Sequence, residues 1–299
     1  MPTDLHRQPP AARQIFVSRP EAKVDPAELG QTLTWLGRTR RITERDELVL
    51  ETLQDLGVLS LDQLQRLFWP EAKASTAADR LSKLLSWHLL RMARQPWRKF
   101  PADGLSPEAV YGVGPGGFLW FGDDEPENYA YHLIDPAWVW RQLRLAEFYT
   151  RLHAGLQTYN KPVSLRWFNP LMEPWLADLT QITPAALLQL GHFVFWLEPD
   201  RPDWAKVVAG YDRLAQQQWS APPELELPAQ PQGVLVITVS TDRIAELAWE
   251  VAQRREAAVA YLFVAWPDLL ASPNPLTAPI WLRLAPGKNE LQRVNWVSE

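Results

Sequence analysis

The stretch from Ile42 to Val113 constrains the fold of this chain most, because three helical patterns with start signals are followed by two strand patterns. Thr43 can cap the first free amides of one helix, and Ser60 those of a second, shorter one. Ser75 or Thr76 is expected to cap a third helix. Three short helices joined by tight turns follow the plan of a helix-turn-helix unit.

Each expected helix carries an apolar stripe at helical spacing. The stripes are Leu48, Leu50, Thr52, Leu53 and Leu56 in the first helix, Leu61, Leu64, Leu67 and Phe68 in the second, and Ala77, Ala78, Leu81, Leu84 and Leu85 in the third. Gly57 supplies a stop for the first helix, and Trp69-Pro70 ends the second because proline cannot continue it. These stripes predict one small helical core.

Two strand patterns follow the third helix. Leu89–Arg94 is expected to form a strand, Gln95–Pro107 a polar and basic hairpin loop, and Ala109–Val113 the returning strand. A hairpin in this position is the wing of a winged helix, so residues 38–122 are predicted to form a winged helix-turn-helix domain.

The third helix and the hairpin carry the side chains expected to bind DNA. These are Lys73, Ser75, Thr76, Arg80 and Lys83 on the helix and Arg91, Arg94, Trp97, Arg98 and Lys99 on the wing. From Arg66 to Lys99 there are eight cationic and two acidic residues, although the whole chain has a net charge of -5. Because cationic groups displace the counterions of a duplex, this segment predicts binding to double-stranded DNA. A helix-turn-helix that only contacts proteins, with a solvated positive face, is the alternative.

Composition excludes several other classes of function. The absence of cysteine excludes disulfides, thiolate zinc sites and a cysteine nucleophile, and the five histidines lack the spacing of metal ligands. No cofactor and no metal are therefore expected. No apolar run is long enough to cross a bilayer and the start of the chain lacks the apolar core of a signal peptide, so a cytoplasmic protein without membrane contact is expected.

The segments on either side of this domain have different expected roles. Residues 1–37 are rich in proline, alanine and charge and are predicted to form a flexible arm. Arg38, Arg40 and Arg41 follow it, and this segment is expected either to lie along phosphates or a minor groove of DNA or to be a solvated linker. The run Gly112–Gly117 is interpreted as the turn by which the wing leaves the domain, and not as a phosphate-binding loop, because no helix is expected directly after it. Residues 123–160 are expected to hold a linker and a long helix, Pro136–Tyr159, which could pair with its copy in a dimer.

Beyond residue 160 the pattern predicts an α/β domain with a mixed sheet. The expected strands are Val163–Phe168, His192–Leu197, Gly233–Val239 and Ala258–Trp266, with Ile182–Leu190 ambiguous and Trp281–Leu284 as an edge strand. The expected helices are Asp203–Gln218 and one capped by Thr241 that ends near Arg255. Together with the N-terminal region, this predicts an α+β or α/β chain of two domains.

Two groups of motifs in the chain belong together. The first comprises Thr43-Glu44-Arg45-Asp46, Leu59-Ser60-Leu61-Asp62-Gln63-Leu64, Phe68, Arg80-Leu81, Leu84 and Val110-Tyr111-Gly112-Val113-Gly114-Pro115-Gly116-Gly117. The second comprises Phe195-Trp196-Leu197-Glu198-Pro199-Asp200-Arg201, Lys206 and Tyr211. With these motifs the chain resembles the replication-relaxation family of plasmid and mobile-element proteins over about residues 40 to 265.

This resemblance implies that residues 161–299 have a restriction-endonuclease-like fold. In a nuclease of that fold, acidic groups hold a divalent ion and a lysine positions the water, and Glu198, Asp200 and Lys206 are the weak catalytic candidates. However, Pro184-Ala185 stands where an upstream Pro-Asp is expected, and Lys206 lies five residues before Tyr211, one more than in the family pattern. Because alanine cannot bind a metal ion, the domain is expected to be a non-catalytic scaffold.

The leading hypothesis is a non-enzymatic, dimeric DNA-binding protein that controls plasmid or mobile-element replication, transfer or transcription. Its expected partners are duplex DNA, a second copy of the chain, and plasmid replication or transfer proteins. Two alternatives remain, namely a metal-dependent nuclease of restriction-endonuclease-like fold and a protein-interaction adaptor that uses the winged helix.

Overall fold

The structure is a computed structural model that describes residues 26–94, 105, 107, 109–122, 136–159, 163–169, 184–216, 227, 231–254 and 259–295. In these ranges the chain is a mixed α and β protein. It divides into an N-terminal unit that ends at Thr150 and a C-terminal unit that begins at Arg151. The division falls within the sequence of helix α6 (Pro136–Gln157).

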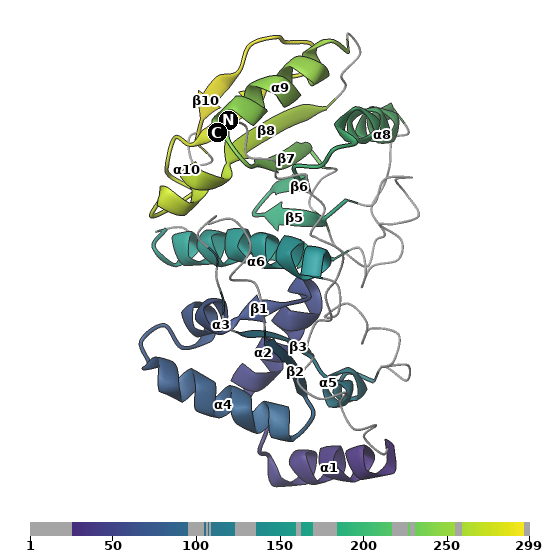
Figure 1. Ribbon diagram of the computed structural model, residues 1–299, viewed down its shortest axis with the longest axis vertical. Helices are drawn as coiled ribbons and strands as arrows, with labels where there is room; N and C mark the ends of the chain where they lie inside the picture. Colours follow the sequence, from purple (N-terminus) through teal and green to yellow (C-terminus); the bar gives the residue numbers. More distant parts are fainter. Residues whose placement is uncertain are drawn as a thin grey trace. The chain divides into compact units, whose positions relative to one another are not determined.

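The centre of the N-terminal unit is made of three helices, α2 (Glu44–Leu56), α3 (Leu61–Phe68) and α4 (Ala74–Ser86), as Figure 1 shows. Thr43 and Ser60 each form a complete capping box with the residue three positions later, so both predicted caps are confirmed. The third cap is different. Lys73 occupies that position without a side-chain hydrogen bond, and Ser75 and Thr76 lie inside the first turn of α4.

A three-stranded antiparallel sheet completes this core. Its order is β1 (Leu59–Ser60), β3 (Ala109–Val113) and β2 (Leu90–Arg94), so the two predicted hairpin strands pair as expected. Most of the hairpin loop, including Trp97, Arg98 and Lys99, lies outside the described residues. The core also includes the first part of α6, because Val139 and Leu143 pack against Val58, Ala93 and Val110. That part of α6 therefore belongs to a domain core and is not a linker.

The prediction of a flexible arm is wrong for residues 26–37. Helix α1 (Pro26–Thr39) begins at a proline, which is favoured in the first turn, and buries Leu29 and Leu36. These two leucines are seven residues apart and therefore lie on one helix face. Residues 1–25 lie outside the described part of the chain.

The glycine run also differs from its interpretation as a turn. A short helix, α5 (Pro115–Trp120), follows β3 directly. A Cβ on Gly114 would lie 2.5 Å from the carbonyl oxygen of His88, and one on Gly117 would lie 2.5 Å from that of Leu89. The glycines therefore allow α5 to pack against the backbone at the start of β2. The amides of Gly114 and Gly116 donate hydrogen bonds to the carbonyl oxygens of Leu89 and His88, so they are not available to a phosphate.

The C-terminal unit is built on one mixed seven-stranded sheet of order β10-β9-β8-β7-β6-β5-β4. The strands are β4 (Leu165–Phe168), β5 (Ala186–Leu190), β6 (Phe193–Pro199), β7 (Gly233–Thr238), β8 (Ala260–Ala265), β9 (Trp281–Leu284) and β10 (Gln292–Val294). The neighbours β6, β7 and β8 are parallel, and the other pairs are antiparallel. The predicted edge strand β9 is internal, because β10 pairs with its outer side.

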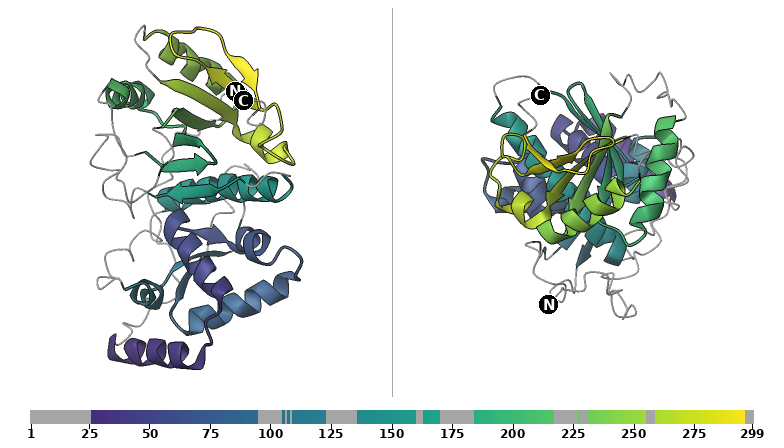
Figure 2. Two further views of the ribbon diagram at one scale, coloured as in Figure 1. Left: turned by 180° about the vertical axis from the view of Figure 1, so that it is seen from behind. Right: turned by 90° about the horizontal axis from the view of Figure 1, so that it is seen from above.

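Helices α8 (Trp204–Gln216) and α9 (Thr241–Ala252) connect the three parallel strands and pack on the same face of the sheet (Figure 2). Ser240 caps α9, one residue earlier than predicted. Helix α10 (Trp266–Ala271) follows β8. At the C-terminal end of α10, the carbonyl oxygens of Leu269 and Ser272 accept hydrogen bonds from Arg151 of α6. None of the described helices is long and apolar enough to cross a membrane.

Candidate nucleic-acid interface

The outer face of α4 is exposed along its whole length. Ala77, Leu81 and Leu84 are the buried residues of this helix and hold it against the core. The exposed side is made of Lys73, Ala74, Ser75, Thr76, Asp79, Ser82, Lys83 and Ser86. It combines two lysines and four hydroxyl groups with one carboxylate, and lysine and hydroxyl groups are side chains that bind phosphates and base edges.

Arg80 is not part of that free surface, although it belongs to the predicted set. Its Nε donates to Asp46 Oδ1 at 2.7 Å, and its Nη2 donates to Asp46 Oδ2 and to the carbonyl oxygen of Arg41. The guanidinium carbon also lies 5.4 Å from the ring centre of Trp87. Arg80 therefore fixes α4 to the start of α2 and is a positioning residue.

Asp46 is the buried partner of this contact, with 1% of its side chain exposed. It also accepts hydrogen bonds from the amide and hydroxyl of Thr43, at 2.7 and 2.6 Å. Burial alone would raise the pKa of Asp46, but the hydrogen bonds from Arg80 and Thr43 outweigh burial and lower it. The capping box thus holds a charged carboxylate where α4 meets α2.

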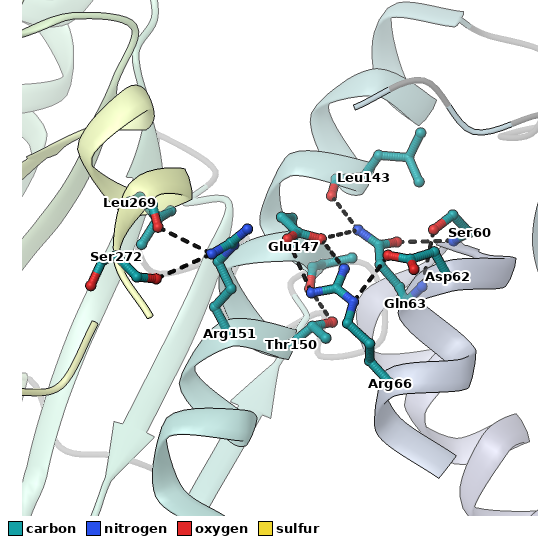
Figure 3. Close-up of polar contacts among 11 residues, drawn as sticks. Ser60, Asp62, Gln63, Arg66, Leu143, Glu147, Thr150, Arg151, Leu269 and Ser272 are labelled. Carbon is teal, nitrogen blue, oxygen red and sulfur yellow. Dashed lines mark hydrogen bonds and ion pairs between the residues drawn. The ribbon is translucent and has the colours of Figure 1, made fainter. Parts of the chain in front are cut away.

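Arg66 is neutralised in a similar way (Figure 3). It donates to Asp62 at 3.0 Å and to both carboxylate oxygens of Glu147 on α6, at 3.1 and 2.5 Å. Gln63 donates to the same carboxylate at 3.2 Å and to the carbonyl oxygen of Leu143 at 3.0 Å. This polar network joins α3 to α6 inside the N-terminal unit and takes Arg66 out of the predicted positive surface.

The expected charge cluster is therefore weaker in the folded chain than in the sequence. Two of its six described cations, Arg66 and Arg80, are paired with buried carboxylates. Arg94 is exposed at the end of β2 and Arg91 is half-buried, while Glu71 and Asp79 add negative charge nearby. The sequence could not reveal this pairing, because Glu147 and Asp46 lie 81 and 34 residues away from their arginines.

An open groove of about 770 Å³ lies between the start of α2 and the outer face of α4. It is lined by Thr43, Glu44, Arg45, Asp46, Trp69, Thr76, Asp79, Arg80 and Lys83. The guanidinium carbon of Arg45 lies 5.9 Å from the ring centre of Trp69. The groove contains charges of both signs, and its exposed cations are Arg45 and Lys83, beside the exposed carboxylates of Glu44 and Asp79.

The C-terminal unit holds the three weak catalytic candidates in a different setting. Glu198 lies near the carboxyl end of β6 with 1% of its side chain exposed, and it accepts a 2.6 Å hydrogen bond from the hydroxyl of Tyr211. Arg201 Nη1 lies 3.6 Å from its other oxygen. Burial raises the pKa of Glu198 to about 7, against the opposing effect of Tyr211 and Arg201.

Asp200 and Lys206 do not complete a metal site with Glu198. Asp200 accepts from Nε of Arg243 at 3.2 Å with both oxygens, and Lys206 is exposed on α8. The register pairs Ala186 with Leu197, which puts Ala185 opposite Glu198. Within the described residues no group of three histidine or acidic side chains could hold a metal ion.

Comparison of this chain with models of known protein families, with curated proteins and with solved structures gave no match.

Proposed function

We propose that this chain binds duplex DNA through its N-terminal unit, as a winged helix in which α4 is the recognition helix and β2 and β3 form the base of the wing. The observation that carries the proposal is the outer face of α4, which is exposed along its length and rich in lysine and hydroxyl groups. A helix of this kind that follows a shorter helix and a tight turn fits the width of the major groove.

Each group on this face has a distinct role in the proposal. Lys73 and Lys83 lie ten positions apart, near opposite ends of α4, and bind phosphates on either side of the groove. Ser75 and Thr76 approach the bases from the first turn of the helix. The wing adds Arg94 at the end of β2. Arg80 contributes indirectly, because its ion pair with Asp46 sets the position of α4.

We propose that the C-terminal unit is a non-catalytic scaffold of restriction-endonuclease-like fold, used for dimer assembly or for contact with replication or transfer proteins. The order of α6, β4, β5, β6, α8 and β7, with β6 and β7 parallel, supports such a core. The ion pairs that Arg201 and Arg243 form with Glu198 and Asp200 support the absence of catalysis, since cations take the place that a metal ion would need. The resemblance to the replication-relaxation family suggests a role in plasmid or mobile-element replication, transfer or transcription.

The test is a titration of labelled, mixed-sequence duplex DNA at several salt concentrations. Wild type is expected to bind with an affinity that falls steeply between about 50 and 200 mM salt. The variant Lys73→Ala with Lys83→Ala should lower the slope of log K against log salt by about 1.8, because two phosphate contacts are lost. Lys288→Ala, which removes an exposed charge from the C-terminal unit, is the matched control and should leave the slope unchanged.

Two outcomes would contradict the proposal. The first is an affinity for DNA that is absent or insensitive to salt and to the double substitution. The second is nicking of supercoiled plasmid in Mg²⁺ or Mn²⁺ that disappears in Glu198→Ala, since this would make the chain a nuclease.

A further inference from the structure

A compact group of arginines lies between α1 and α2. Arg38, Arg40 and Arg41 occupy three of four successive positions, and all three are exposed. No acidic residue lies between Arg38 and Thr43. None of the three forms an ion pair with any of the residues that the structure describes. We call Arg38–Arg41 the basic turn.

The basic turn is fixed to the proposed recognition helix. The carbonyl oxygen of Arg41 accepts a 2.8 Å hydrogen bond from Nη2 of Arg80 on α4. The guanidinium carbon of Arg41 lies 4.8 Å from the ring centre of Trp35, a residue that is 43% exposed. A cation held over an aromatic face loses less freedom when it binds a phosphate, so Trp35 presents Arg41 in advance. Figure 1 shows α1 below α4 and α5 in this unit.

The backbone of Arg40 gives an independent reason to look for a function. Its φ is 49°, in the left-handed region, at the position just beyond the end of α1. The amides of Arg40 and Arg41 donate to the carbonyl oxygens of Gly37 and Leu36, which is the hydrogen bonding of a C-terminal helix cap. Glycine or asparagine is usual there, because a Cβ is strained in this conformation. Arginine at this position costs stability without a compensating contact among the described residues, and such strain is typical of functional positions.

We propose that the basic turn is a second DNA contact, which binds the phosphate backbone of duplex DNA next to the major groove that α4 enters. The proposal rests on the function proposed above and decides between the roles, DNA contact or solvated linker, that the sequence left open for these three arginines. Guanidinium groups suit this task, because each can donate two parallel hydrogen bonds to one phosphate. The bond between Arg80 and Arg41 keeps the turn and α4 in a constant relation, so both engage the same duplex.

Arg40→Gly is the decisive variant, because it should weaken DNA binding without lowering the stability of the fold. Removing the strained side chain should raise the thermal midpoint or leave it unchanged. Removing the cation should lower the slope of log K against log salt by about 0.9, so that the loss of affinity between about 50 and 200 mM salt shrinks about 3.5-fold. Arg40→Asn, which also tolerates the left-handed region, should behave in the same way.

Two controls separate the effect of backbone strain from the effect of losing a positive charge. Among the described residues, His88 is the second non-glycine residue with a positive φ, 57°, and lies two positions beyond the end of α4. His88→Gly relieves this strain and should raise the midpoint without changing the salt slope. Lys288→Ala removes an exposed charge from the C-terminal unit and should change neither quantity. The triple variant Arg38→Ala, Arg40→Gly and Arg41→Ala should lower the slope by about 2.7.

The outcomes distinguish this inference from the proposed function. If wild type binds duplex DNA and the triple variant binds with the same affinity and salt slope, the basic turn is not a contact, whereas α4 can still be one. If Arg40→Gly lowers the thermal midpoint, the arginine has a structural role and the inference is overturned. If wild type does not bind duplex DNA at any salt concentration, the proposed function fails and the inference fails with it.

Discussion

Arg80→Ala tests whether the ion pair between α4 and α2 contributes to the free energy of unfolding. The substitution removes the bidentate partner of Asp46, whose side chain is 1% exposed, and leaves the carboxylate with Thr43 alone. It also removes the donor to the carbonyl oxygen of Arg41 and the cation beside Trp87. A buried carboxylate with fewer hydrogen bonds is costly in its charged form.

The magnitude follows from the burial and the remaining partners. Removing one partner of a buried ion pair costs about 3–5 kcal/mol. Arg80 is 22% exposed, and Asp46 keeps two hydrogen bonds from Thr43, so the cost should lie at or just below the lower end of that range, at about 2–3 kcal/mol. Lys83→Ala, three residues along the same helix, should change the free energy of unfolding by less than about 0.5 kcal/mol, because Lys83 is exposed.

Urea unfolding of wild type, Arg80→Ala, Asp46→Asn and the double variant measures this coupling. In the Asp46→Asn background no buried charge remains, so Arg80→Ala should cost about 2 kcal/mol less than it does in wild type. The pKa of Asp46 is lowered in the folded protein, so its contribution is present above pH 3.8 and is lost as pH falls through the folded value. The difference between wild type and Arg80→Ala should therefore be largest near neutral pH and should narrow in acid.

Either of two results would refute this reasoning. One is an Arg80→Ala protein as stable as Lys83→Ala, and the other is an equal cost of Arg80→Ala with and without the Asp46 carboxylate. A loss of DNA binding in Arg80→Ala is informative only after its stability has been measured, because the variant changes the position of α4.

Two further predictions concern stability. Burial raises the pKa of Glu198 from 4.5 to about 7, so its contribution to stability is largest below pH 4.5 and falls by about 3 kcal/mol as pH rises from 4.5 through 7. Glu198→Gln should flatten this decline in the free energy of unfolding. Parallel curves of that free energy against pH for wild type and Glu198→Gln, measured by urea unfolding, would contradict the prediction. Gly117→Ala should lower the free energy of unfolding by about 2–3 kcal/mol, because its Cβ would lie 2.5 Å from the carbonyl oxygen of Leu89. Gly30→Ala should raise it by about 0.5–1 kcal/mol, because Gly30 lies inside α1 and a Cβ there would have no atom within 4 Å. Thermal unfolding of the two alanine variants compares them directly, and equal midpoints would show that α5 does not need its glycines.

Local signals in the sequence located most of the elements. Thr43 and Ser60 cap the helices that they were predicted to cap, since a capping box is formed by residues three positions apart. The runs around β6, β7 and β8 are strands because continuous apolar residues are buried on both faces of a sheet. The segment 186–190 was ambiguous on pattern alone, and its pairing with both β4 and β6 decides that it is a strand.

The stripe of α2 shows where periodicity fails. Leu48 was expected inside but is 52% exposed, whereas Val49 is buried. The inward face also contains Asp46, and apolar periodicity cannot predict a buried carboxylate. Its burial depends on Arg80, which lies 34 residues further along the chain. The prediction of a flexible arm fails at residues 26–37 for a similar reason. Helix α1 is held by the burial of Leu29 and Leu36, and this burial exists only in the folded unit.

Local pattern is enough to predict the order of helices and strands, their start and stop signals, and the lysine and hydroxyl groups of the outer face of α4, because these depend on neighbours within a few residues. Which cations remain exposed and without an ion pair depends on how the chain folds. Arg66 and Arg80 are paired with Glu147 and Asp46, while the arginines of the basic turn are exposed beside α4. Ion pairs form between groups that folding brings within about 4 Å, and that proximity cannot be inferred from a local pattern.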